Sequence, residues 1–346
     1  MNNPPAKPNP PILGVLAAFA AVYVIWGSTY FGIKVAIESL PGFTMAGVRF
    51  LTAGSLLYIW CRWRGAARPT LLGWRNTFIV GGLLLFGANG SVVWAEQRVP
   101  SGLTALLVAI LPVWMVLIEW LRPNGNRPTK GVVVGVLMGV VGVGVLIGPE
   151  SIIVGNAVDS LGALALLAAG FLWALGSIYS RHSTMPPSPL LATSMQMLAG
   201  GALLAVLGVF TGDWARFDPA NVTSRSLWAL AYLIVFGSWI GFSAYVWLLR
   251  VTTPARVSTY AYVNPVVALV IGWGLGNESL DARTLIAACV IIAAVAVITL
   301  GGQSVRSKRR ASEVVEVKSA DEAAVCCDER PAAPILGAKP TECGQA

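Results

Sequence analysis

The chain has 346 residues, of which 56% are hydrophobic and only 12% are charged. A soluble domain carries about 25% charged residues, so this composition excludes a water-soluble globular protein and predicts one embedded in a lipid bilayer. The formal charge of +8 does not indicate a nucleic-acid binder, because the basic residues stand at the ends of apolar segments and no nucleic-acid module is recognisable.

Apolar windows long enough to cross a bilayer follow one another along the chain. A membrane span needs about 20 mostly apolar residues. The windows that meet this length are 12–34, 43–61, 71–95, 101–121, 130–148, 160–181, 190–210, 226–249, 257–275 and 282–301. The sequence therefore predicts an all-α integral membrane fold with ten transmembrane helices.

The two ends of the chain differ from this apolar part. The first window follows a Pro-rich stretch and has no small-x-small cleavage site, so we expect a retained helix and not a signal peptide. Residues 303–346 are rich in charge, Ala and Pro, which is typical of a disordered tail. If residues 1–11 are cytoplasmic, the inner loops hold 15 Lys and Arg residues and the outer loops hold four. Because positive residues accumulate on the cytoplasmic side, we expect both termini to be cytoplasmic.

The two halves of the chain resemble each other. After a shift of 147 residues Trp26 falls on Trp173, and after a shift of 153 residues Pro112 falls on Pro265. Chance matching among apolar residues is the alternative, but Trp and Pro are rarer and keep their order. The halves therefore predict an internal duplication.

The duplication has a geometric consequence. We expect one five-helix repeat over residues 12–148 and a second over 160–301. An odd number of helices per repeat makes the two repeats antiparallel in the membrane, which is the inverted-repeat plan of many secondary transporters.

Polar and aromatic residues inside the windows are candidates for a central site. Pro112 and Pro265 lie about halfway along their windows, so we expect each to kink its helix and to act as a hinge; the alternative is that proline is simply frequent in membrane helices. The amide of Asn264 binds either a solute or a backbone carbonyl freed by the kink. Trp26 and Trp173 would line the two ends of one cavity, or would anchor their helices at the interface.

Two charged side chains within or beside the windows, Arg49 and Glu96, are intramembrane suspects. Arg49 lies about 9 Å inside its window at 1.5 Å per residue and remains charged. We expect a structural clamp, in which Arg49 pairs with Glu38, with Glu96 or with helix-end carbonyls. Glu96 either couples transport to protons or lies solvated in a loop.

Catalytic, metal and cofactor sites are not expected. His182 is the single histidine, and no cysteine pair has metal-ligand spacing with histidines. A membrane-embedded enzyme would need a catalytic set that the windows lack, and a sensor or scaffold would be favoured by a folded soluble domain. Secondary transport of a small molecule, driven by an ion or solute gradient, is the preferred hypothesis.

Four motifs carry a resemblance to a known family: 24-VIWGSTYFGIK-34, 46-AGVRF-50, 98-RVPSGLTALLVAILPVW-114 and 260-YAYVNPVVALVIGWGLGNESL-280. Over about residues 12–301 the chain resembles the EamA branch of the drug/metabolite transporter superfamily, and within it the YedA-type permeases. The resemblance implies an inner-membrane exporter of amino acids, other metabolites or toxic compounds, with a central cavity and no ATPase domain. It also implies the cavity-lining positions Trp26, Tyr30, Asn89, Trp94, Trp173, Trp239, Tyr260 and Asn264.

Overall fold

The computed structural model describes residues 11–98, 104, 107–123, 127–147, 160–276 and parts of 282–298. Within these ranges every regular element is a helix and none is a strand. Among the described residues, six helices are long and apolar enough to cross a membrane, and two shorter apolar helices, Leu111–Leu121 and Lys130–Gly142, accompany them. The all-helical membrane character is thus confirmed. Much of the tenth predicted window, and the predicted tail 303–346, lie outside the described residues.

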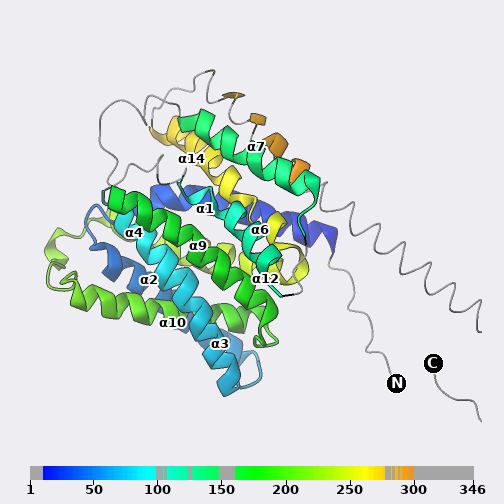
Figure 1. Ribbon diagram of the computed structural model, residues 1–346. Helices are drawn as coiled ribbons and strands as arrows, with labels where there is room; N and C mark the ends of the chain where they lie inside the picture. The colour runs from blue at the N-terminus through cyan, green and yellow to red at the C-terminus, as the bar shows by residue number, and fades with distance from the viewer. Residues whose placement is uncertain are drawn as a thin grey trace, which may run out of the picture. The chain divides into compact units, whose positions relative to one another are not determined.

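The helices follow the predicted windows in chain order (Figure 1). The elements of the first half are α1 (Ile12–Ala36), α2 (Gly42–Trp63), α3 (Leu71–Gly81), η1 (Gly82–Asn89), α4 (Gly90–Ala95), α6 (Leu111–Leu121) and α7 (Lys130–Ile147). Those of the second half are α9 (Ser160–His182), α10 (Pro189–Phe210), η2 (Pro219–Asn221), α11 (Ser224–Tyr232), η3 (Leu233–Phe242), α12 (Ser243–Val251), α13 (Pro254–Val257) and α14 (Tyr260–Gly276).

Two of the long spans have a π-helical middle. The span Leu71–Ala95 contains η1, and the span Ser224–Val251 contains η3. Backbone bonds in a π-helix run from residue i to i−5, and such turns occur frequently at functional sites. The shift of 153 residues carries η1 onto residues 235–242, which lie within η3. Both halves therefore widen the third helix at related positions.

Helices α2 and α10 pack along each other (Figure 1). A Cβ added to Gly201 of α10 would lie 2.8 Å from the backbone nitrogen of Leu51 in α2, so the two backbones are too close there for any side chain. Small residues allow such close approach in lipid, where van der Waals packing replaces the hydrophobic effect. The pair joins the second helix of the first half to the second helix of the second half.

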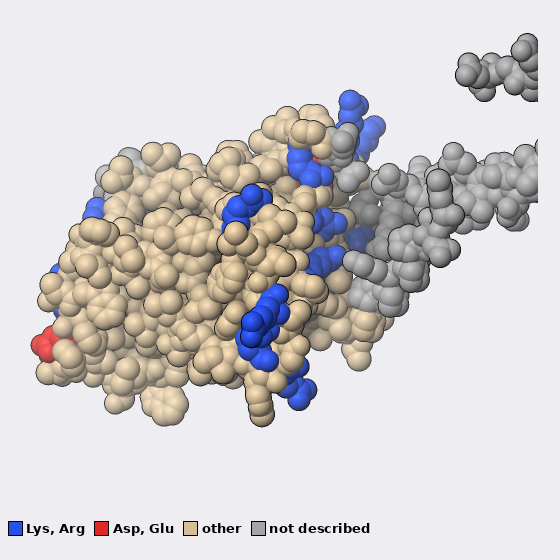
Figure 2. All heavy atoms as spheres, turned by 90° about the horizontal axis from the view of Figure 1, so that it is seen from below, with Lys and Arg blue, Asp and Glu red and all other residues tan. Residues whose placement is uncertain are grey.

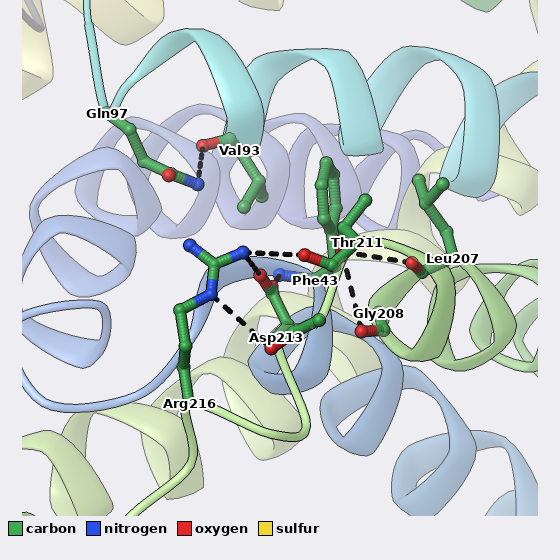
Figure 3. Close-up of polar contacts among 9 residues, drawn as sticks. Phe43, Val93, Gln97, Leu207, Gly208, Thr211, Asp213 and Arg216 are labelled. Atoms are coloured by element: carbon green, nitrogen blue, oxygen red, sulfur yellow. Dashed lines mark hydrogen bonds and ion pairs between the residues drawn. The ribbon is translucent and has the colours of Figure 1, made fainter.

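Asp213 links the two halves at one end of this pair. It lies after α10, and its carboxylate accepts a hydrogen bond of 2.9 Å from the backbone N–H of Phe43 in the first turn of α2. Arg216 lies 3.2 Å from the same carboxylate and also donates to the carbonyl of Thr211 (Figure 3). The first N–H groups of a helix have no partner within the helix, so Asp213 satisfies one of them from the other half of the chain.

Other polar contacts join helix ends on the opposite side of the bundle. Arg181, near the end of α9, donates to the carbonyl of Leu249 at 2.8 Å. Asn76, near the start of the third helix, donates to the carbonyl of Thr184 at 2.9 Å. These contacts bring the start of α3, the end of α9 and the end of α12 together, so α3 runs opposite to α9.

The outer surface between the helix ends is apolar. Large hydrophobic side chains such as Phe210 and Trp228 are exposed. In the face shown in Figure 2 most of the surface carries uncharged side chains, and the basic side chains gather mainly toward one end. This distribution suits a belt that faces lipid tails, with charges at the headgroup level.

Candidate functional site

A cavity of about 90 Å³ lies among helices from both halves of the chain. Its wall includes residues of α1, α2, η1, α6, α9, η3 and α14. Pockets for drug-sized ligands measure about 300–1,000 Å³, so the cavity in this conformation fits only a small solute. Ten of the residues in its wall are polar or aromatic: Trp26, Thr29, Tyr30, Arg49, Phe50, Asn89, Trp173, Phe242, Tyr260 and Asn264.

An aromatic cluster centred on Trp26 forms one part of this wall. The Trp26 ring lies 5.5 Å from that of Trp173 in an edge-to-face arrangement, and 5.0 Å from those of Tyr245 and Tyr260. The prediction that Trp26 and Trp173 line opposite ends of the cavity is therefore wrong. Both indole N–H groups are already bonded, that of Trp26 to the carbonyl of Gly237 and that of Trp173 to the hydroxyl of Tyr245. The hydrogen bonds fix the orientation of both rings.

Arg49 contributes the positive charge of the cavity wall. Its side chain is buried, and its Nε donates to Ser238 Oγ in η3 at 3.0 Å. The guanidinium carbon lies 4.7 Å from the ring centre of Phe50, a distance at which cation–π attraction operates. The absent side chain of Gly237 makes room for the guanidinium, because a Cβ there would lie 2.7 Å from Nη2.

The carboxylate partner expected for Arg49 is not found among the described residues. Glu38 instead lies 3.7 Å from Arg225 at the start of α11. Glu96 makes no ion pair with Arg49 within the described part of the chain. The hydroxyl of Ser238 takes the place of a carboxylate, which leaves the charge of Arg49 without a described counter-ion.

Glu96 directly follows α4 and is half-buried, which contradicts one of its two alternatives, a residue solvated in a loop. Both of its carboxylate oxygens are buried, and neither accepts a hydrogen bond from a described residue. Lys34 and Tyr30 lie close enough to interact with it electrostatically. Because Tyr30 also lines the cavity, the carboxylate of Glu96 lies close to the cavity wall.

The two asparagines of the wall differ in their bonding. The Asn264 amide, turned with its nitrogen toward two carbonyls, donates to Tyr260 at 3.0 Å and to Tyr23 at 3.3 Å. These bonds tie α14 to α1 and use both donor hydrogens. Asn89, the last residue of η1, has a buried Oδ1 with no hydrogen-bond partner in the described structure. Asn89 therefore keeps an acceptor for a ligand.

Two of the expected lining residues lie elsewhere. Trp239 donates from its indole N–H to the carbonyl of Ala53 at 2.8 Å. The Trp94 ring lies 4.4 Å from the guanidinium of Arg98. Neither is among the residues that line the cavity. Window position gives the depth of a residue but not the helix face on which it lies, so the sequence could not exclude them.

The two prolines differ in their local structure. Pro265 lies inside α14, as expected. Pro112 lies in the first turn of α6 and not halfway along a helix, with two turn residues, Ala109 and Ile110, before it. Proline is tolerated in a first turn because that N–H has no helical partner. Pro112 therefore follows a break in the helix instead of kinking it.

Gly237 and Ser238 belong to the site although they were not predicted. The signal was present in 237-GSW-239, where a small and a hydroxyl residue interrupt an apolar window. A serine in such a window satisfies itself by bonding to its own helix, and Ser238 does donate to the carbonyl of Leu233. The partner Arg49, 189 positions away in the chain, could not be inferred from that signal.

Comparisons with known proteins agree with the membrane fold. A model of the EamA-like transporter family matches residues 12–148 and 160–300. The inner membrane transporter YedA of Escherichia coli K12 is 37% identical over 90% of this chain and 98% of its own length. The transporter YoaV of Bacillus subtilis is 23% identical over 80% of this chain and 94% of its own.

The fold is also similar to one that has been solved. A crystal structure of a protein with 22% sequence identity superposes with a TM-score of 0.70 and covers 86% of this chain and 99% of its own. At that identity the likeness shows a common fold only. The matches to the family model and to YedA confirm the resemblance noted in the sequence, and the chain belongs to the EamA-like transporter family.

Proposed function

We propose that this protein is a secondary transporter that exports a small metabolite, amino acid or drug-like solute across the cytoplasmic membrane. The cavity, lined from both halves of the chain, is the observation that carries this proposal. Its aromatic rings and its few polar groups suit the binding of a small organic solute. Family membership and the transporter relatives support transport as the activity.

The proposed architecture is ten transmembrane helices in two inverted five-helix repeats, with both termini in the cytoplasm. It is supported by the family model, which matches the chain twice. It is further supported by the π-helical segments at related positions and by the pairing of α2 with α10. Accessibility tags at the two chain ends test it: both should be protected in intact cells, and tags on opposite sides would contradict the layout.

Alternating access is the proposed mechanism. In an inverted-repeat carrier each repeat can adopt the conformation of the other, which moves the opening from one side of the membrane to the other. The π-helical segments η1 and η3 contribute Leu85, Asn89 and Gly237 to the cavity wall. A change in the backbone hydrogen bonds of η1 and η3, together with bending of α14 at Pro265, would move the cavity wall directly. A proton or solute gradient would drive the cycle.

Export profiling tests the proposed function. Cells that overproduce the protein should accumulate a defined set of metabolites in the medium relative to cells with an empty vector. Trp26→Ala should abolish this accumulation at equal abundance in the membrane, because Trp26 holds the aromatic cluster together. Trp228→Ala is the matched control, since this tryptophan is 76% exposed on the outer surface. Identical profiles for the vector and the wild type would refute the proposal.

A further inference from the structure

The charge of the cavity wall is not balanced. The described lining residues include one cation, Arg49, and no carboxylate. Arg49 is only 5% exposed, and the single hydrogen bond of its guanidinium that the structure describes uses Nε. Its two terminal nitrogens, each with two N–H donors, have no described protein acceptor.

A buried and unpaired guanidinium is unfavourable, because desolvation of the charge is not repaid by an opposite charge nearby. The cation–π contact with Phe50 compensates only in part. The fork of terminal N–H groups matches the two oxygens of a carboxylate in a bidentate, charge-assisted pair. The carboxylate of a solute would therefore supply the opposite charge that Arg49 lacks among the described residues.

A second group in the same wall points to further chemistry of the solute. The Oδ1 of Asn89 is buried without a hydrogen-bond donor in the described structure. Leaving a buried acceptor unpaired is costly, so a solute that carries a hydroxyl or N–H group next to its anionic end would satisfy it. One cation balances one negative charge, and the volume of about 90 Å³ restricts the size.

We propose that the transported solute is a small monocarboxylate whose carboxylate pairs with Arg49 and whose hydrogen-bond donor meets Asn89. This inference rests on the proposed transport function and names its substrate class. It assigns Arg49 to substrate binding, where the sequence alone favoured a structural clamp.

The first test compares export by Arg49 variants. Metabolites exported by the wild type should carry a carboxylate, and Arg49→Gln should lower their export by about tenfold or more, the effect expected for loss of a buried charge pair. Arg49→Lys keeps the charge without the fork and should retain part of the activity. Arg225→Gln, on an exposed arginine, should export at the wild-type rate. Each variant is compared at equal membrane abundance.

Purified full-length protein provides a second test that does not depend on transport. Lactate should raise the thermal unfolding midpoint of the wild type, whereas its neutral amide, lactamide, should not. Arg49→Lys should keep a reduced shift with lactate, and Arg49→Gln should lose it.

The outcomes separate the two proposals. Export of solutes that carry no carboxylate, or equal export by wild type and Arg49→Gln, would overturn the carboxylate inference and leave transport intact. An equal shift with lactate and lactamide would also overturn it. Absence of any export by the wild type would instead remove the transport function on which the inference rests.

Discussion

Gly237→Ala tests whether the guanidinium of Arg49 depends on a side-chain-free position in η3. The new Cβ would lie 2.7 Å from Nη2 of Arg49 and 3.1 Å from Cγ2 of Thr29. To reach an ordinary contact distance the guanidinium must retreat by about 0.7 Å. Its bond to Ser238, now 3.0 Å long, would then be broken or strained.

The expected magnitude follows from three contributions. Overpacking costs about 1–3 kcal/mol, and loss of a hydrogen bond to a charged group costs about 1.5–3 kcal/mol. The better helix propensity of Ala offsets up to about 1 kcal/mol. Together these contributions predict that the free energy of unfolding falls by about 1.5–6 kcal/mol.

The assay is thermal unfolding of the purified protein, with export measured in cells. Gly144→Ala in α7 is the matched control, because a Cβ there meets no described atom within 4 Å. Gly144→Ala should be neutral or slightly stabilising and should transport normally. If Gly237→Ala unfolded at or above the wild-type temperature and exported at the wild-type rate, the proposed geometry around Arg49 would be wrong.

Three further changes have defined outcomes. Pro265→Ala should slow transport in proteoliposomes without unfolding the protein, because it restores a backbone hydrogen bond within α14. Pro112→Ala, in the first turn of α6, should have a smaller effect. Equal transport rates in both variants and the wild type would contradict the hinge hypothesis. Glu96→Gln should flatten the dependence of export on external pH if this buried carboxylate carries the coupled proton; an unaltered pH profile would exclude that role. Asp213→Asn should lower the free energy of unfolding by about 1 kcal/mol, because it weakens the cap on α2 that joins the two halves. The thermal unfolding midpoint should fall accordingly, and Asp218→Asn in the neighbouring loop should lower it less.

Hydropathy and length were sufficient to predict most of the membrane spans. The window 71–95 coincides with the span Leu71–Ala95, and 43–61 lies within Gly42–Trp63. In the window 101–121 the described structure has two turn residues, Ala109 and Ile110, directly before the helix Leu111–Leu121. Apolar content reports whether a segment can enter lipid, and it carries no information on where the backbone departs from a regular helix. The π-helical segments therefore had no signal in the sequence.

The residues of the candidate site were predicted only in part, because the sequence does not show how each helix is rotated. Trp26, Tyr30, Asn89, Trp173, Tyr260 and Asn264 were predicted from the family resemblance, and all of them line the cavity. Trp94 and Trp239 were predicted from the same resemblance and contact other neighbours. A residue enters a cavity only if its helix is rotated toward it, and that rotation depends on packing between helices far apart in the chain. The contact of Arg49 with Ser238 depends on the same packing.

The bonded indoles have a consequence for the range of compounds that this protein accepts. Since the N–H groups of Trp26 and Trp173 are occupied within the protein, both rings offer a guest only carbon surface. Dispersion forces are indifferent to the identity of the atoms that fill such a space and sensitive to their volume. Members of a homologous series should then be sorted by bulk and chain length, and replacement of one functional group by another of the same size, away from Arg49 and Asn89, should change transport little.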